Sequence, residues 1–420
     1  MSDTILDSVA LAYQPVWDAR RRLAAVRLRV LAVQPDAVDG AHLLETLAED
    51  WPKAAPLLSL SFDSARLREQ ALASDPAQNT WIEVPAEPFT APDSLALLAQ
   101  AVRRGHQLLR VAPLAQVRGE LIAPLDVRSL VQHTPEEALQ ALRAHAAGSG
   151  AARPAPPSAI LAGHLYQGIA SRALADHCLD NEGAWGLADW PEDDVLHGWR
   201  DKPLVGDAAT IRQCQQAIEH DCSLDQLERY LRQDPVLIYR LLTLVNSAAY
   251  GTDREIETLR HSIMMVGFAS LKNWLGKQLD GAETDEDLHP VRYAQVMRAR
   301  LAQHLLESGS EEELRAEVYL TALFAQLDRL MQKPLGPLLH KLPLSGRVLD
   351  AVLRKEGVYF PYLDVARAQS DFGHLHLLPA ICKSHEITLE QANRSLLRML
   401  ATSRDQTHPP REHPWAQHRD

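Results

Sequence analysis

The first 195 residues alternate short apolar runs with amphipathic stretches, a pattern typical of strands and helices in turn. Residues 12–30, AYQPVWDARRRLAAVRLRV, hold two apolar runs around a basic turn, which predicts a strand, a turn and a second strand. Further strands are predicted at residues 58–62, 80–86, 106–112, 120–127 and 158–165. Because helical stretches separate these runs, we expect β/α units around a mostly parallel sheet or barrel.

Beyond a boundary near residues 191–203 the strand signals stop, and apolar residues recur at helical spacing. We therefore expect two domains, an α/β barrel at residues 1–195 and an all-α domain at residues 200–402. Residues 146–158, AAGSGAARPAPPS, combine Gly with Pro and predict a loop inside the first domain. The polar residues 403–420 contain several prolines and are expected to be disordered.

The composition bears on partners and location. The 420 residues include 43 basic and 55 acidic side chains, and the net charge of −12 opposes general binding to nucleic acid or to an anionic membrane. No secretory signal is predicted, and the most apolar segment, residues 261–276, is too short for a membrane span and is interrupted by Lys272. Cysteines without a CxxC pair are typical of reduced thiols in a cytoplasmic protein: Cys178, Cys214, Cys222 and Cys382.

The strongest helix signal lies in residues 231–251, LRQDPVLIYRLLTLVNSAAYG. Asp234 can accept hydrogen bonds from the free amides at a helix start, and Pro235 loses no hydrogen bond at the first helical position. Gly251 supplies a stop. The apolar stripe between these signals has helical spacing and consists of Ile238, Leu241, Leu242 and Val245. The pattern predicts a well-capped helix with one buried face.

Asn246 and Ser247 lie near the end of this apolar helix. Buried polar groups need hydrogen-bond partners, and an unpaired one costs about 1 to 3 kcal/mol. We therefore expect Asn246 to be structural, with its amide joining the helix end to backbone near residues 261–268.

These residues resemble the HDOD domain, a bacterial all-helical module related to the HD phosphohydrolases but without their metal ligands. The resemblance rests on DPVLIYRLLTLVNSAAYG at 234–251, on EIETLRHSIMMVGFASLKNWL at 255–275 and on residues 319–357. HD enzymes hold a metal with a His-Asp pair on a helix. The matching positions here are Ala325 and Gln326, so the resemblance implies a domain that binds no metal.

Two short motifs look like functional sites by their letters alone. His220 and Asp221 form a His-Asp pair, but they precede a predicted helix start at Ser223 and have no further ligands at suitable spacing. The triplet Asp-Phe-Gly at 371–373 has no accompanying phosphate loop or kinase catalytic segment. We assign neither motif a metal-binding or nucleotide-binding role.

With a second half similar to HDOD, the first half resembles a degenerate EAL domain, the TIM-like barrel that hydrolyses cyclic di-GMP. Gln14, Pro15 and Asp18 match the opening of EAL-HDOD signalling proteins. EAL enzymes hold divalent metals through carboxylates and an asparagine. The resemblance aligns other residues with most of these ligands and with the active-site lysine: Arg27, Ser61, Val111, Ala112 and Pro124. Glu83 and Asp126 alone keep a ligand-type side chain.

Arg27 aligns with the glutamate of the family's Glu-Ala-Leu triplet, near the end of the second predicted strand. A guanidinium cannot ligate a metal, and its fixed charge repels one. Arg27 could be a solvated strand residue or the remnant of a lost active site. Both interpretations lead to a barrel without catalysis.

We expect a catalytically inactive cytoplasmic signalling regulator that acts through protein contacts, without catalytic residues, cofactor or metal. Its partner would be a protein of the signalling pathway, and the resemblance also implies self-association. Two alternatives stay open. The barrel could bind cyclic di-GMP or another nucleotide without hydrolysis, with Arg27, Arg29 or residues 20–22 meeting phosphates. A working cyclic di-GMP phosphodiesterase is the least favoured alternative because most metal ligands are missing.

Overall fold

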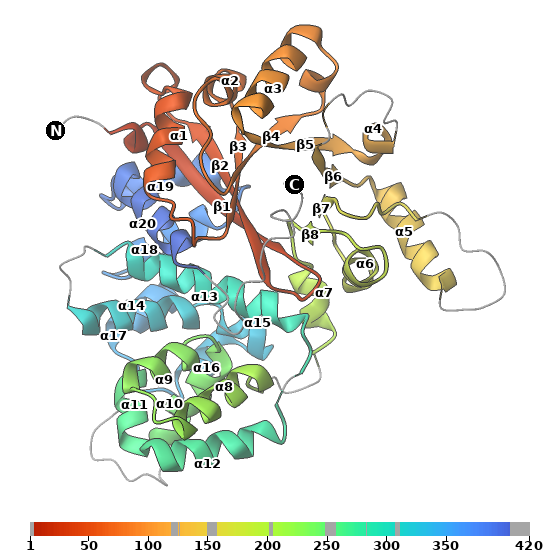
Figure 1. Cartoon of the computed structure of the whole chain (residues 1–420). Helices are drawn as coiled ribbons and strands as arrows, with labels where there is room; N and C mark the ends of the chain where they lie inside the picture. Colours follow the sequence, from red (N-terminus) through yellow and green to blue (C-terminus); the bar gives the residue numbers. More distant parts are fainter. Residues whose placement is uncertain are drawn as a thin grey trace.

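The computed structural model describes residues 4–118, 125, 127–148, 158–200, 205–247, 258–282, 284–306 and 311–403. Its first part, here called the barrel, is a closed ring of eight strands in chain order (Figure 1). The strands are β1 Val9–Trp17, β2 Leu23–Ala32, β3 Leu57–Phe62, β4 Thr80–Pro85, β5 Gln107–Pro113, β6 Arg128–Gln132, β7 Leu165–Gln167 and β8 Gly186–Leu187. The α-helices of this part are α1 Gly40–Glu49, α2 Ala65–Ala73, α3 Pro92–Arg104, α4 Leu114–Arg118, α5 Pro135–Gly148, α6 Arg172–Asp176 and α7 Glu192–His197.

The second part, here called the helical region, contains only helices among the described residues 205–403. Its α-helices are α8 Ala208–Glu219, α9 Leu224–Leu231, α10 Pro235–Val245, α11 Leu259–Val266, α12 Phe268–Leu279, α13 Leu288–His304, α14 Glu312–Phe324, α15 Leu327–Met331, α16 Leu335–Leu339, α17 Gly346–Leu349, α18 Phe360–Gln369, α19 Leu378–Ser384 and α20 Leu389–Ala401. Short 3₁₀ or π segments complete the chain: η1 Ile5–Asp7, η2 Pro35–Ala37, η3 Glu87–Phe89, η4 His177–Asn181, η5 Asp350–Arg354 and η6 Leu375–Leu377. The predicted order of an α/β barrel followed by an all-α part is confirmed.

The barrel opens with an antiparallel hairpin. β1 and β2 pair antiparallel, and the turn between them holds Arg21 at a φ of 56°, which few residues other than Gly adopt. From β2 to β8, each strand runs parallel to the next strand. β1 closes the ring against β8 through the pair Trp17 and Leu187. The strand, turn and strand predicted for residues 12–30 are therefore confirmed.

The later strands agree less well with the sequence pattern. β3, β4 and β5 confirm three predictions, whereas the strand predicted at 120–127 lies almost wholly outside the described residues. The prediction at 158–165 was wrong, since of these residues only Leu165 belongs to a strand, and β6 and β8 were not predicted. Strands of two or three residues show no alternation that a sequence could reveal. The loop predicted at 146–158 begins later, because α5 extends to residue 148.

One apolar layer inside the barrel contains one residue from each of the eight places around the ring of strands. Its members are Val16, Ala25, Leu57, Trp81, Leu109, Leu130 and Leu165, together with Ala188 directly after β8. Inward-facing side chains of a small barrel stack in such layers and fill its interior. This layer closes the barrel below the polar residues described in the next section.

The helical region contains the capped helix that the sequence predicts. The Asp234 carboxylate is fully buried and accepts hydrogen bonds from the backbone N–H groups of Val236 and Leu237, at 2.8 and 3.1 Å. Pro235 is the first helical residue. The predicted stripe from Ile238 to Val245 is buried. Gly251, the predicted stop, lies outside the described residues.

Side chains near the end of the helical region bond to the free edge of β1. The Asn393 side-chain oxygen accepts from the Leu11 N–H at 3.2 Å, and its amide donates to the carbonyls of Leu6 and Val9, both at 2.8 Å. Gln369 donates to the Leu11 carbonyl at 3.3 Å. In Figure 1 the blue helices α18 and α20 accordingly lie beside the red β1. Residues 382 positions apart thus complete the hydrogen bonding of one strand.

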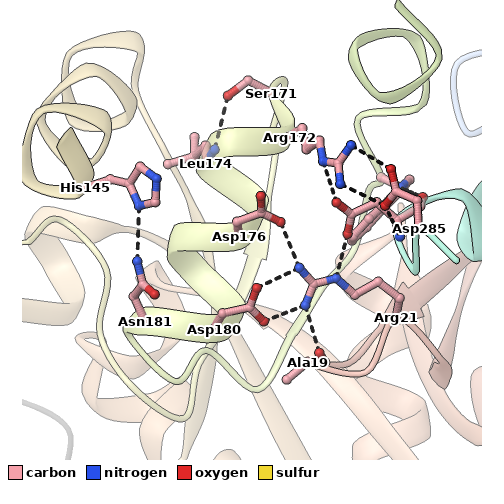
Figure 2. A network of polar contacts seen from close by, with 12 residues as sticks. Ala19, Arg21, His145, Ser171, Arg172, Leu174, Asp176, Asp180, Asn181 and Asp285 are labelled. Carbon is pink, nitrogen blue, oxygen red and sulfur yellow. Dashed lines mark hydrogen bonds and ion pairs between the residues drawn. The ribbon is translucent and has the colours of Figure 1, made fainter. Parts of the chain in front are cut away.

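A second junction joins the hairpin turn to the helical region (Figure 2). The Arg21 guanidinium donates to Asp176 at 2.8 Å and to Asp180 at 2.5 Å, and its Nε donates to Asp287 at 2.7 Å. Burial by itself would lower the pKa of Arg21, but the bonds to Asp180 and Asp287 raise it above its usual value. The turn at Arg21 is therefore held by carboxylates from both parts of the molecule.

Arg172 adds a second cation to this junction. It donates two hydrogen bonds to Asp285, at 2.8 and 2.7 Å, and forms an ion pair with Asp287 at 2.6 Å. Trp190 donates from its indole nitrogen to the Asp287 carbonyl at 2.9 Å. Residues 285–287 precede α13, so the start of this long helix is fixed against the barrel.

Two expectations about the whole chain can be compared with the structure. The helices of the described ranges include none that is both long enough and apolar enough to cross a membrane. The four cysteines are free thiols, and three of them are buried.

Replacing Asn393 should destabilise the whole chain. In Asn393→Leu, a side chain of the same branching, the Leu11 N–H and the carbonyls of Leu6 and Val9 each lose a hydrogen-bond partner, and we expect a loss of about 3 kcal/mol or more in unfolding free energy. Urea unfolding followed by circular dichroism measures this loss. Arg398→Ala, an exposed position on the same helix, is the matched control and should change stability by about 0.5 kcal/mol at most. Equal effects of the two substitutions would contradict the assigned role of Asn393.

His304 should make stability depend on pH. Burial, followed by the charges of Arg300, Arg315 and Arg398, lowers the pKa of this histidine from 6.5 to about 4. Between these values the unfolded chain binds a proton that the folded chain does not, so unfolding free energy should fall as pH decreases from about 6.5 to about 4 and then level off. Unfolding of His304→Gln across this range should show a shallower pH dependence than wild type. The exposed control His220→Gln should follow the wild-type curve.

Candidate functional site

The candidate site is a polar layer inside the barrel, next to the apolar layer and closer to the barrel mouth, where strands β2 to β8 have their carboxyl ends. Side chains two positions apart on a strand face the same side. On each strand, the residue two positions from the apolar-layer residue, toward the barrel mouth, therefore faces inward and belongs to this second layer. They are Gln14, Arg27, Ser59, Glu83, Val111, Gln132 and Gln167, one on each strand from β1 to β7.

A bidentate ion pair occupies the middle of this layer. Arg27 Nε and Nη2 donate to the two Glu83 carboxylate oxygens at 2.7 and 2.9 Å. Ser59 donates to the same carboxylate at 2.9 Å. Arg27 Nη1 donates to the side-chain oxygens of Gln14 and Gln167, at 2.5 and 3.3 Å. Both charged side chains are buried, at 4% exposure each, and every partner comes from a different strand.

The pair keeps both groups ionised in the interior. Burial alone would raise the pKa of Glu83, but the charge and hydrogen bonds of Arg27 hold it below its usual value. Burial would likewise lower the pKa of Arg27, and Glu83 raises it. A carboxylate whose pKa is lower in the folded chain contributes stability at neutral pH and loses that contribution as pH falls through the folded pKa. The Glu83 oxygens are therefore committed to Arg27.

An aromatic ring from the helical region covers the mouth above this pair. Phe372 follows α18, and its ring centroid lies 5.4 Å from the Arg27 guanidinium carbon and 5.9 Å from that of Arg29. Arg29 is the next inward residue on β2 and donates to Asp63 at 2.9 Å. Cations over an aromatic face are attracted to it. The docked helical region thus closes the barrel over its polar layer.

The structure corrects the expectations for Arg27. It lies in the middle of β2, not near its end, and it is buried, so the interpretation as a solvated strand residue was wrong. Glu83, one of the two ligand-type residues that the alignment retains, is its ion-pair partner. Ser61 lies one inward position closer to the mouth than Ser59, and its hydroxyl contributes to lowering the pKa of Glu83.

The other aligned positions contribute less. Val111 faces the interior beside the apolar layer, whereas Ala112 packs on the outer side of β5 among the core residues beneath the helices. Pro124 and Asp126 lie outside the described residues. Among the aligned positions that the structure describes, Arg27, Ser61 and Glu83 come together, and the β5 residues bring no polar group to the layer.

Sequence reasoning missed several residues of the site, beginning with Ser59, which donates to Glu83. Gln167 ends β7 and contacts Arg27, and Asp189 accepts hydrogen bonds from the Gln14 side chain and from the Gly168 N–H. Phe372 belongs to the triplet at 371–373, to which the sequence assigned no role. Strand alternation could have indicated Gln167, since it lies two positions after Leu165. No local pattern indicates that Phe372 reaches the barrel.

The positions that would hold the His-Asp pair in an HD enzyme have another use here. Ala325 and Gln326 follow α14, and Gln326 accepts a hydrogen bond from Arg298 on α13. Arg298 also donates to Ser370 at 2.8 Å. His220 ends α8 and its ring contacts the Gln216 carbonyl at 2.7 Å. Across the described ranges, no group of three or more His, Cys, Asp or Glu side chains is arranged to hold a metal.

The end of α10 contains the two polar residues singled out in the sequence. Asn246 donates from its side chain to the Leu242 carbonyl at 2.8 Å, and Ser247 donates to the Leu244 carbonyl at 2.7 Å. Both bonds cap the last turn of their own helix. The bond from Asn246 toward residues 261–268 stays a prediction.

Comparison with known families identifies one domain. Residues 206–335 match the model of the HDOD domain. This segment begins two residues before α8 and ends at the first residue of α16. The remaining helices, including α18 and α20 on the barrel, lie beyond the matched segment.

Individual relatives are distant. The chain is 24% identical over 149 residues to the uncharacterized protein YuxH of Bacillus subtilis, covering 34% of this chain and 36% of that protein. It is 23% identical over 152 residues to the cyclic di-GMP phosphodiesterase CdgJ of Vibrio cholerae, covering 36% of this chain and 34% of that protein. The chain thus matches about a third of the length of each. The response regulator MmoQ of Methylococcus capsulatus has a TM-score of 0.38 and 18% identity, over 47% of this chain and 98% of that one.

Removing Arg27 should be far more costly than removing its neighbour. Arg27→Ala leaves the Glu83 carboxylate buried and unpaired, and we expect a loss of about 3 to 5 kcal/mol in unfolding free energy. Arg29→Ala is the matched control, because its pair with Asp63 is partly exposed and should contribute about 1 kcal/mol or less. Chemical denaturation of both variants at neutral pH measures the difference.

A double substitution tests whether the unpaired charge causes this loss. Arg27→Leu combined with Glu83→Leu removes both charges and should recover most of the stability lost in Arg27→Ala. A double variant as unstable as Arg27→Ala would attribute the loss to packing instead.

Proposed function

We propose that this chain is a non-catalytic signalling protein in cyclic di-GMP-related signalling, and that it acts through contacts with other proteins. The HDOD match at residues 206–335 supports a signalling role. The similarity to CdgJ, a cyclic di-GMP phosphodiesterase by name, supports the connection with that nucleotide. The proposal includes a cytoplasmic location.

The observation that carries the proposal is the Arg27–Glu83 ion pair in the barrel interior. Hydrolysis by an EAL-type barrel needs hard oxygen ligands that converge on divalent metals. In this chain a guanidinium stands at the aligned glutamate position and already binds both oxygens of the Glu83 carboxylate. Phe372 also covers the barrel mouth. Among its described residues, the barrel therefore lacks both a free set of metal ligands and an open path for a substrate.

The proposed contact surface belongs to the helical region. On α11, Met264 and Met265 are 58% and 45% exposed, although apolar side chains of this size are usually buried. Flexible, polarizable methionines suit a protein contact. The net charge of −12 opposes a nucleic-acid or membrane partner, so we propose a protein of the signalling pathway, with self-association as a further expectation.

An assay of the purified full chain tests the absence of catalysis. With cyclic di-GMP and either Mg²⁺ or Mn²⁺, no linear dinucleotide should form above the level of a control without protein. Arg27→Glu should not restore turnover, because it places a second carboxylate beside Glu83 without supplying the other ligands. Turnover by wild type that Arg27→Ala abolishes would contradict the proposal.

Calorimetric titration of the same protein with cyclic di-GMP separates the proposal from the receptor alternative. We expect no saturable heat of binding. Saturable binding without turnover would instead assign the barrel a receptor role, in which Arg29 at the mouth would be the first residue to substitute.

A further inference from the structure

A cavity of about 200 Å³ lies between the barrel and the helical region. The barrel contributes Trp17 on β1 and Asp189, Trp190 and Glu192 from the segment after β8. The helical region contributes Arg298 on α13 and Phe372 after α18. The volume corresponds to about seven water molecules in the liquid, so a small organic ligand would fit. Ligand sites occur preferentially at such junctions between domains.

The charges around this cavity are predominantly negative. Asp189, Glu192 and Asp371 contribute three carboxylates, and Arg298 is the one cationic side chain among the lining residues. The guanidinium of Arg298 is already engaged, because it donates to the Ser370 hydroxyl and to the Gln326 side chain. These partners are uncharged, so Arg298 keeps its positive charge, and the lining carries three carboxylates against this one cation.

Asp189 is the carboxylate best placed to hold a ligand. It accepts hydrogen bonds from the side chain of Gln14 and the N–H of Gly168, both uncharged donors. Within the described part of the chain it forms no ion pair, whereas Glu192 is paired with Arg329 at 3.1 Å. Burial raises the pKa of Asp189 above its usual value, as expected for a carboxylate without a direct counter-charge.

Aromatic side chains form part of the remaining wall, beside Pro15, Ala188 and Ala294. Trp17 and Trp190 are buried, and Trp17 is held by edge contacts with His289 and Tyr293 at centroid distances of 6.4 and 6.0 Å. Aromatic faces attract organic cations, and the attraction is stronger where water is excluded. Phe372 already contacts two guanidiniums on its barrel side.

We propose that this cavity is a binding site for a small planar organic cation of the amidinium or guanidinium class, with Asp189 as its counter-ion and Trp17 and Trp190 as its walls. A planar cation of this class can donate two parallel hydrogen bonds to a carboxylate, and its faces can stack on the indoles. Because its lining comes from both parts of the molecule, the bound cation would stabilise their docked arrangement. The cavity adjoins the barrel's polar layer, since Gln14 and Phe372 border both, but the inference does not rest on the proposed function.

Three isosteric probes test the charge preference on the full chain: benzamidinium, neutral benzamide and anionic benzoate. Benzamidinium should quench tryptophan fluorescence saturably and raise the melting temperature, and the other two should bind at least tenfold more weakly. Asp189→Asn should weaken benzamidinium binding at least tenfold without changing benzamide binding. The exposed control Asp225→Asn should leave both unchanged, and Arg298→Gln should strengthen binding of the cation.

Each other outcome overturns the proposal. Equal binding of the three probes would make the cavity a neutral apolar pocket, and preferred binding of benzoate would reverse the assigned charge. Absence of benzamidinium binding up to its solubility limit would leave the cavity as solvent space. The melting temperature of Asp189→Asn without ligand shows whether the variant folds. If it does not fold, the comparison of the three probes on the wild-type chain still tests the charge preference.

Discussion

The hydrogen bonding of the β1 edge is the constraint on which the rest of the structure depends. β1 meets β8 at a single residue pair in the described structure, so most of its outer edge has no strand neighbour. Asn393 and Gln369 supply the missing donors and acceptors from the other end of the chain. Since buried backbone groups are costly to leave unpaired, the barrel and the last helices stabilise each other.

This docking determines what the barrel interior can do. α18 lies against β1, and the loop after it places Phe372 over Arg27 at the mouth. Beneath the Phe372 side chain, Arg27 and Glu83 neutralise each other's charge. A catalytic barrel would instead keep its carboxylates free to bind metals. The same docking creates the cavity beside Asp189, where carboxylate has no such partner. Closure and the new cavity are two consequences of one interface.

The HDOD match ends at residue 335, and α18 and α20, which bond to the β1 edge, come later. Asp285 and Asp287, which bond to Arg172 and to the hairpin turn, lie inside the match. The matched segment contains α10, whose buried Asp234 cap fixes the start of the helix, and α11, which exposes Met264 and Met265. The matched segment thus contains both the exposed α11 and, at residues 285–287, one of the attachments to the barrel.

The sequence by itself determined the features that depend on local chemistry: the hairpin around Arg21, strands β3 to β5, and the start of α10 at Asp234 and Pro235. Side-chain alternation and helix capping are decided within a few residues, so a single sequence reveals them. The two-residue strand β8 and the burial of Arg27 were decided only by the tertiary structure. A short strand exists because its neighbours present hydrogen-bonding groups, and Arg27 is buried because Glu83, 56 positions away, neutralises it.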